Sequence, residues 1–473
     1  MNVYEHHLKI LKGSKLSVPT KEEADRRWRD LVPPPQKEEE QLRRQWVGVR
    51  LPSSGADGSS GIGGAVASMK SRGYRVEEAE RLMEAGLKAL DEKDWKKLRV
   101  ITSEIHECLH DARKDPMHKY WNFETIETWE DYCDAVRGWM PDKPIGQEDY
   151  IRKTRAGWYG QMIGGTAGSQ LEGYHYDEIA RNMREFKSYL GIPSVYNDDI
   201  TYEIAFLEAC KKRGKAVTSK DIAREWLSWI PLGMSAEGIA MRNLKQGIYP
   251  PESGRVGNYY CEWIGAQMRG AVCGMLAPGK PREAARLAWL DGQISHANNG
   301  IIGEVFSALL VSLAYIEQDM RDVLEKTMGM LPKSSEYYNV MKNTMDICRE
   351  CEDWRTAWKT CLEELKEYTW VHAYPNGAAE VVAIWFGCND FEKMLEIICL
   401  EGYDADSTAA PLLTAAAMIT GIENIDPKWI APVSGELDTY LYGRQKFTVE
   451  ELTKETTAAY LHFLGDRAAD TCF

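Results

Sequence analysis

Residues 160–173 read Gly-Gln-Met-Ile-Gly-Gly-Thr-Ala-Gly-Ser-Gln-Leu-Glu-Gly, which places small residues at helical spacing ahead of an acid. A glycine inside a helix is less favourable than alanine by roughly 1 kcal/mol, so repeated glycines need a compensating gain. Close contact with another helix is the commoner explanation, and approach of a ligand is the alternative. We therefore predict a closely packed helix here, with Glu172 at its end as a candidate metal ligand or general acid/base.

The sequence after residue 145 has helical periodicity almost throughout. Pro281 suits the first turn of a helix. Thr448 and Glu451 form a capping box, which predicts a helix that starts near Val449. Alternating β-branched runs are nearly absent, whereas Ala, Leu, Met, Glu and Lys are abundant. We predict a fold of the all-α class.

The N-terminal part of the chain differs in composition from the rest. It has a charged start, a run of three prolines and a Ser/Gly-rich stretch over residues 53–61. Apolar residues at steps of three and four predict helices over 76–90 and 95–112. We therefore expect two units: an N-terminal extension over 1–145, partly flexible and with a helical subdomain, and an α-helical domain over 146–473.

Composition excludes several classes of function. Among the 473 residues, 44% are hydrophobic and 27% are charged, and the formal net charge is −14. This charge argues against a broad nucleic-acid surface, which needs clustered Lys and Arg. No apolar run has the length needed to cross a bilayer, and the N-terminus lacks the pattern of a secretory signal, so we expect a cytoplasmic protein. The oligomeric state stays open.

Two acidic stretches stand where helices are expected to begin. They are Asn197-Asp198-Asp199 and Asp404-Ala405-Asp406-Ser407. Acids at a helix start also act as caps, because the free N–H groups and the helix dipole stabilise negative charge. Several carboxylates together, with a hydroxyl beside them, also suit hard cations such as Mg²⁺, Ca²⁺ or Mn²⁺. The stretches therefore predict a cation site, with helix capping as the alternative.

Five segments in a fixed order resemble the ADP-ribosylglycohydrolase family over about residues 155–435. Each segment alone is a weak signal, and the order of all five makes the resemblance specific. They are the glycine-rich segment, Asn197-Asp198-Asp199, Gly265-Ala266-Gln267-Met268-Arg269, Ser295-His296 and Asp404-Ala405-Asp406-Ser407.

The resemblance implies an orthogonal multi-helix bundle and an enzyme that hydrolyses a glycosidic bond at the anomeric carbon of ADP-ribose or a related furanosyl sugar. It also implies Mg²⁺ (or Mn²⁺), as two ions, and a small-molecule or protein-linked glycoside as substrate. The matching ligand positions are Asn197, Asp198, Asp199, Asp404, Asp406 and Ser407.

Roles beyond the metal ligands follow from the same match. Glu172 and Asp199 are the candidate catalytic residues, and the expected substrate contacts are His296, Asn299, Tyr403 and Gly265. Several positions depart from the family pattern: Asn197 stands in place of Thr, Ile200 in place of Thr, and Tyr403 in place of Gly. Because these changes fall beside the acids, the sugar or the aglycone can differ from ADP-ribose.

Two other functions remain open. The segment His106-Glu107-Cys108-Leu109-His110 matches the HExxH motif of zinc metallopeptidases. The apolar stripe of its helix includes Ile101 and Ile105, whereas Thr102 and both histidines fall on the polar face, which disfavours a zinc cleft. The second alternative is a sugar- or nucleotide-binding member of the fold that lacks catalysis.

Overall fold

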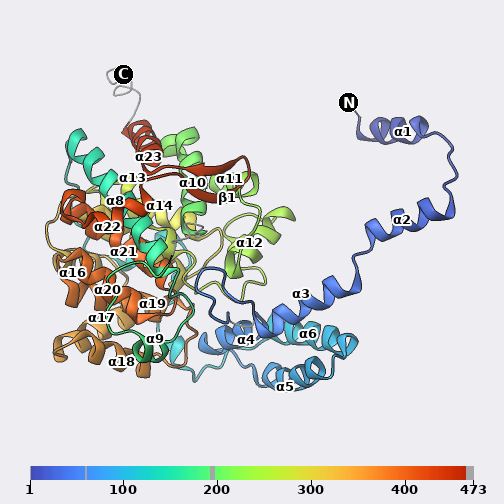
Figure 1. The fold of residues 1–473 in the computed structure, drawn as a ribbon, viewed down its shortest axis with the longest axis horizontal. Coiled ribbons are helices and arrows are strands. Elements are labelled where there is room, and N and C mark those ends of the chain that lie inside the picture. The colour runs from blue at the N-terminus through green and yellow to red at the C-terminus, as the bar shows by residue number, and fades with distance from the viewer. Residues whose placement is uncertain (1, 59–60, 192–197, 465–473) are drawn as a thin grey trace.

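The computed structural model describes residues 2–58, 61–191 and 198–464 (Figure 1). Within these ranges nearly all of the regular elements are helices, and the predicted all-α class is confirmed. The single sheet in the described part is an antiparallel hairpin of β1 (Leu437–Leu441) and β2 (Arg444–Phe447). The sequence did not predict this hairpin, because its strands have only five and four residues. No helix of the described part is long and apolar enough to span a membrane.

The N-terminal helices form an arm and a small bundle. In Figure 1, α1 and α2 run outward from the body, and neither has a buried residue. Helices α3, α4, α5 and α6 pack around a separate small core that includes Trp46, Ile62 and Ile105, whereas α7 packs into the core of the larger body. The helices predicted at 76–90 and 95–112 are present as α5 and α6. The bounds are α1 (Val3–Gly13), α2 (Lys21–Leu31), α3 (Pro35–Val47), α4 (Gly61–Ser71), α5 (Glu77–Asp91), α6 (Trp95–His110) and α7 (Trp129–Ala135).

The larger body contains the remaining helices. Its core is one continuous hydrophobic cluster. Ile126 and Tyr132, which precede residue 145 in the chain, also belong to this cluster. The boundary between two units at residue 145 stays a prediction. The bounds are α8 (Gln147–Gly168), α9 (Tyr176–Asn182), α10 (Asp198–Arg213), α11 (Ser219–Trp229), α12 (Ser235–Lys245), α13 (Ala271–Leu276), α14 (Pro281–Gly292), α15 (Asn299–Ala314), α16 (Met320–Met328), α17 (Glu336–Glu350), α18 (Trp354–Glu364), α19 (Ala373–Gly387), α20 (Phe391–Glu401), α21 (Ala405–Thr420), α22 (Pro427–Ile430) and α23 (Val449–Leu464).

Local capping signals are realised as predicted. Helix α14 begins at Pro281, and α23 begins at Val449. The Thr448 N–H donates to the Glu451 carboxylate at 2.8 Å, and the Glu451 N–H donates to the Thr448 hydroxyl at 3.2 Å. One local prediction is wrong: Thr102 is buried rather than on the polar face, because its hydroxyl accepts a hydrogen bond from the Trp46 indole at 2.9 Å.

Helices α8 and α21 form the centre of the body, and the glycine stripe makes their close approach possible. A Cβ atom on Gly160 would lie 2.1 Å from the Leu413 carbonyl oxygen. A Cβ on Gly164 would lie 2.4 Å from the carbonyl oxygen of Ala409 on the facing helix. Such distances are far inside van der Waals contact, so any side chain there would push the helices apart. Close helix packing is therefore the physical reason for the repeated glycines.

We expect Gly164→Ala to destabilise the protein by about 1–3 kcal/mol, although alanine favours a helix by itself. The added methyl group meets the backbone of α21, which cannot move away as a flexible side chain would. Urea denaturation followed by tryptophan fluorescence measures the change. Gly435→Ala is the control, because no atom lies within 4 Å of a Cβ built at Gly435. Equal stabilities of the two variants would contradict the packing role.

The same pair of helices sets the positions of Glu172 and the second acidic stretch. Past the end of α8, the Gly173 N–H donates to the Tyr403 carbonyl at 2.8 Å, and the Tyr403 N–H donates to the Tyr174 carbonyl at 2.9 Å. Tyr403 has a φ of +60°, a left-handed conformation that lets the chain turn sharply into α21. Glu172 is thereby fixed beside Asp404.

Candidate metal centre and adjoining cavity

Three acids converge at the junction of α8 and α21. Glu172 follows α8, Asp404 is the N-cap of α21, and Asp406 lies in the first turn of α21. Each of the three residues has one carboxylate oxygen that lies within 4.8 Å of a carboxylate oxygen of the other two. Asp404 and Asp406 are buried and Glu172 is half-buried. The structure thus brings together two predicted metal ligands and the candidate at the end of the glycine-rich helix.

The surroundings of these acids favour a cation. The three acids border a cavity of about 430 Å³, and Glu237 lines the same cavity. Among the described residues that line it, none is Lys, Arg or His. Like charges at such distances repel strongly where water is partly excluded. Carboxylate oxygens are the donors that Mg²⁺, Mn²⁺ and Ca²⁺ prefer, so this donor set fits a hard divalent ion.

The first acidic stretch is described only in part. Asn197 lies outside the described residues, and so does the side chain of Asp198. Asp199 is buried in the first turn of α10 and, among the described acids, falls outside the group of three. Ser407 is buried and lines the cavity, with its hydroxyl 3.7 Å from the Met268 sulfur. The ligand roles of these four residues stay predictions.

Behind the cavity, Arg269 holds a buried network together. Its guanidinium donates to Glu237 at 2.8 Å, to Asp291 at 2.5 Å and to the Ser295 hydroxyl at 3.0 Å. Burial alone would lower the pKa of Arg269, but Asp291, Glu304 and Glu237 outweigh that effect and raise it above its usual value. Arg269 therefore stays charged and fixes Glu237 at the cavity wall.

Gly265 has a structural reason to be glycine. A Cβ on this residue would lie 2.1 Å from a carboxylate oxygen of Glu237, and the Gly265 carbonyl accepts a hydrogen bond from Arg269 at 2.5 Å. Gly265 also lines the cavity, so its predicted place beside substrate is compatible with the structure. The missing side chain leaves space for the Glu237 carboxylate.

His296 and Asn299 lie behind the cavity and are absent from its described lining. His296 is fully buried, with Nδ1 2.8 Å from the Ser295 hydroxyl. Its pKa is lowered by burial and, secondarily, by Arg269, so the ring is neutral at physiological pH. The Asn299 side-chain carbonyl accepts from the Tyr337 N–H at 3.1 Å. Their substrate contacts stay predictions, and the hydrogen bonds shown here are structural.

Tyr403 contributes through its backbone, as described above. Its ring packs edge-on against Trp358 at 6.0 Å and lies near His175 at 5.7 Å, and it is not among the described residues that line the cavity. Substrate contact by Tyr403 also stays a prediction.

Sequence reasoning missed several residues of the cavity wall. Glu237 lies in the first turn of α12, where an acid has the appearance of an ordinary helix-start residue. Trp263 and Trp370 come from loops with no motif. The loop that includes the Ser/Gly-rich stretch contributes Gly58, and Val49 and Leu51 from just before that stretch also line the cavity; all three lie more than 100 residues before Glu172 in the chain. No local pattern could have predicted that this loop reaches the cavity.

The HExxH segment lies on the surface. His106 and His110 are exposed on α6, and the His106 ring stacks on Tyr259 at 5.8 Å between ring centres. In the described ranges, the three acids are the only group of metal-type ligands that comes together, and neither histidine belongs to it. The geometry gives the metallopeptidase alternative no support.

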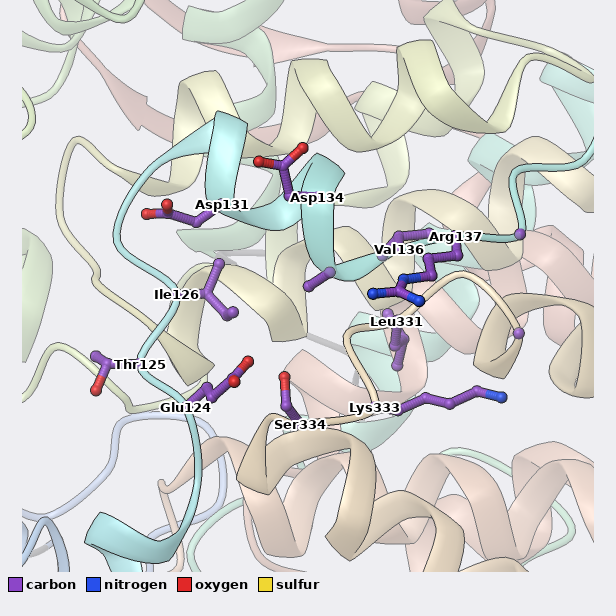
Figure 2. Close-up of a pocket in the computed structure, with 13 residues that line it drawn as sticks. Glu124, Thr125, Ile126, Asp131, Asp134, Val136, Arg137, Leu331, Lys333 and Ser334 are labelled. Carbon is purple, nitrogen blue, oxygen red and sulfur yellow. The ribbon is translucent and has the colours of Figure 1, made fainter.

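A larger cavity of about 930 Å³ lies between the loop around Glu124, helix α7 and the loop around Lys333 (Figure 2). Charges of both signs lie around its rim, with Asp131 and Asp134 apart from Arg137 and Lys333. Asp131 is already used, since it forms a capping box with Thr128. This cavity is larger than the one beside Glu172, Asp404 and Asp406, which we call the acidic cavity. The described lining of the larger cavity brings together no set of catalytic groups.

Comparison with known proteins gives three findings. The family model for ADP-ribosylglycohydrolase matches residues 146–461, about two thirds of the chain. One similar solved structure is described as an ADP-ribosylglycohydrolase-related protein complex, with 19% identity over 67% of this chain and 99% of that chain, and a TM-score of 0.48. No curated protein sequence matches the chain.

Proposed function

Because the chain belongs to the ADP-ribosylglycohydrolase family, we propose that it is a glycoside hydrolase that depends on a divalent cation and uses the acidic cavity as its active site. The observation that carries this proposal is the convergence of Glu172, Asp404 and Asp406. These residues belong to two segments on which the sequence resembles the family. Glu172 and Asp406 are 406 − 172 = 234 positions apart in the chain, and the described lining of their cavity contains no Lys, Arg or His.

The proposed ions are Mg²⁺ or Mn²⁺. Asp404, Asp406 and Glu172 would hold them, and the predicted ligands Asn197, Asp198, Asp199 and Ser407 would complete the set. Such ions bind vicinal sugar hydroxyls and lower the pKa of a bound water.

The protein groups around the cavity have separate roles in this proposal. Glu172 has two alternative roles: it either binds an ion or, because it is only half-buried and can exchange a proton with water, acts as the general acid or base. Glu237, held by Arg269, presents a fixed carboxylate to substrate hydroxyls or to the positive charge of an oxocarbenium-like transition state. Trp263, Trp370 and Met268 offer apolar faces to the sugar or its aglycone.

The N-terminal loop favours a small substrate. Val49, Leu51 and Gly58 line the cavity, and Leu51 packs against Gly173, directly after Glu172. The Tyr174 hydroxyl donates to the Ser54 carbonyl at 3.1 Å and holds the loop in place. A cavity of about 430 Å³ suits a ligand of nucleoside or sugar-phosphate size. We therefore favour a small-molecule glycoside over a linkage on a folded protein.

Hydrolysis assays test the proposal directly. ADP-ribosyl-arginine, ADP-ribosyl-serine and a panel of furanosides are incubated with the protein after EDTA treatment and after addition of Mg²⁺ or Mn²⁺. We expect turnover of at least one substrate, its loss in EDTA and its return with the ion. Tight ligand binding without any turnover would instead support the non-catalytic binding function.

A further inference from the structure

A third cavity lies between the N-terminal bundle and the main body, and its charge is opposite to that of the acidic cavity. We call it the basic cavity; its volume is about 470 Å³. Its charged lining residues are Arg72, Lys114, Arg255 and Glu127, with His110 beside them. In a chain of net charge −14, such a gathering of cations is unusual. It indicates a site for an anion.

Arg72 is the central residue of this cavity. Its Nε atom is buried and, among the described residues, has no hydrogen-bond partner. One terminal nitrogen lies 3.9 Å from the Met69 sulfur, and the guanidinium lies over the Tyr74 ring, 5.7 Å from its centre. Glu262 attracts Arg72 electrostatically. That carboxylate already accepts hydrogen bonds from the Tyr120 hydroxyl at 2.6 Å and the Asn298 amide at 3.0 Å. Arg72 as a whole is half-buried, but a guanidinium whose buried Nε has no acceptor is unfavourable, so a ligand with acceptor oxygens would satisfy it.

Lys114 supplies a second cation at the rim. Its ammonium lies 4.0 Å above the Trp121 ring, and no described carboxylate forms an ion pair with it. Arg255 is less available to a ligand, because its guanidinium donates to the backbone carbonyl of Glu127 at 2.6 Å and lies 3.9 Å from the side-chain carboxylate of the same residue. Arg72 and Lys114 are therefore the two cations that a ligand can recruit.

Aromatic rings make up much of the remaining wall. Tyr74 meets Trp121 edge-to-face at 5.6 Å, and Tyr120 and Tyr259 also line the cavity. Rings of this kind stack on planar heterocycles, whereas a site for inorganic phosphate alone needs no such surface. We propose that the basic cavity binds a nucleoside diphosphate, with its phosphates on Arg72 and Lys114 and its base among these rings.

The position of this site relative to the active-site cavity is defined by one segment. Tyr259 and Cys261 line the basic cavity, and Tyr260 and Trp263 line the acidic one. The two cavities thus lie on opposite sides of residues 259–263. The acidic cavity has four carboxylates and no base in its described lining, so without metal it repels a diphosphate. Binding in EDTA that depends on Arg72 and Lys114 therefore reports on the basic cavity.

Isothermal titration of the full chain with ADP in EDTA tests the site. We expect one binding event, weakened at least about tenfold by Arg72→Met and again by Lys114→Met, because each removes a charge-assisted contact. Lys70→Met is the matched control: Lys70 is on α4, exposed, and pairs with Glu80 away from the cavity. Lys114 is exposed, so its variant keeps the test informative even if Arg72→Met fails to fold.

Parallel titrations with inorganic phosphate and with adenosine separate the two halves of the ligand. Both should bind at least about tenfold more weakly than ADP. Phosphate binding as tight as that of ADP would overturn the role of the rings. No ADP binding, or equal affinity in the wild type and both cavity variants, would overturn the site. Neither result bears on glycoside hydrolysis, which is measured with metal present.

Discussion

Asp406→Asn is expected to lower hydrolysis by on the order of 10²–10³-fold and to weaken Mg²⁺ or Mn²⁺ binding by at least about tenfold. Asp406 is buried in the first turn of α21, with Asp404 and Glu172 close enough to share an ion. Asparagine keeps the size of the side chain and its carbonyl oxygen and removes the charge. The substitution therefore tests the charge of the site and leaves its shape intact.

The same variant has a distinctive stability signature. In EDTA, Asp406→Asn should be at least as stable as the wild type, because it removes one of three mutually repelling carboxylates. Addition of Mg²⁺ should raise the melting temperature of the wild type and leave that of the variant nearly unchanged, since only an ion that binds the folded state stabilises it. Differential scanning calorimetry with and without the ion measures both effects.

Asp322→Asn is the matched control, because Asp322 is also in the first turn of a helix but is exposed and distant in sequence from the acidic segments. It should leave activity, metal affinity and the response to Mg²⁺ unchanged. If Asp406→Asn kept full hydrolysis and the full Mg²⁺ response, the acids at α21 would be helix caps and the proposed active site would be wrong.

The features that the sequence predicted are those that depend on near neighbours in the chain. A capping box joins residues three positions apart, and a glycine stripe repeats every four, so Thr448 and Gly164 could be interpreted without knowledge of the fold. The acids were found because their order along the chain resembles a family. The order of the segments indicates which parts of the chain form the site. The hydrogen bond between Gly173 and Tyr403 shows how the glycine-rich segment and the second acidic stretch come together.

The residues that sequence reasoning missed depend on contacts between distant parts of the chain. Glu237 has the appearance of any acid at a helix start, and it becomes part of the cavity wall only because Arg269 holds it and Gly265 makes room for it. Leu51 lies just before the Ser/Gly-rich stretch 53–61, whose composition indicated flexibility. Its contact with Gly173 makes that loop a wall of the active-site cavity, which no periodicity could reveal.

Arg269→Met is expected to destabilise the protein by about 3–5 kcal/mol, the largest loss of stability among the changes considered. Arg269 is fully buried and is the cation shared by Glu237 and Asp291, with Glu304 3.9 Å away. Methionine fills much of the volume but leaves buried carboxylates without a counter-charge. Urea denaturation followed by tryptophan fluorescence gives the free energy of unfolding.

The pH dependence identifies the cause of that loss. Burial raises the pKa of Glu304, Asp291 raises it further, and Arg269 opposes both. With Arg269 present the pKa of Glu304 is already above its usual value, and without Arg269 it rises further, so the stability of the variant falls more steeply than that of the wild type as pH rises. The deficit relative to the wild type should therefore be smaller at pH 5 than at pH 8. A cavity or packing defect would give a deficit that does not change with pH.

Arg286→Met is the control, because it removes an ion-paired arginine that is not fully buried. Arg286 pairs with Glu283 at 2.8 Å, but both side chains are about 30% exposed, so water can solvate the remaining carboxylate. We expect its loss to change stability by less than about 1 kcal/mol at either pH. Equal effects of the two substitutions would mean that Arg269 is an ordinary ion-pair partner. Glu237 would then need some other support to keep its carboxylate at the cavity wall.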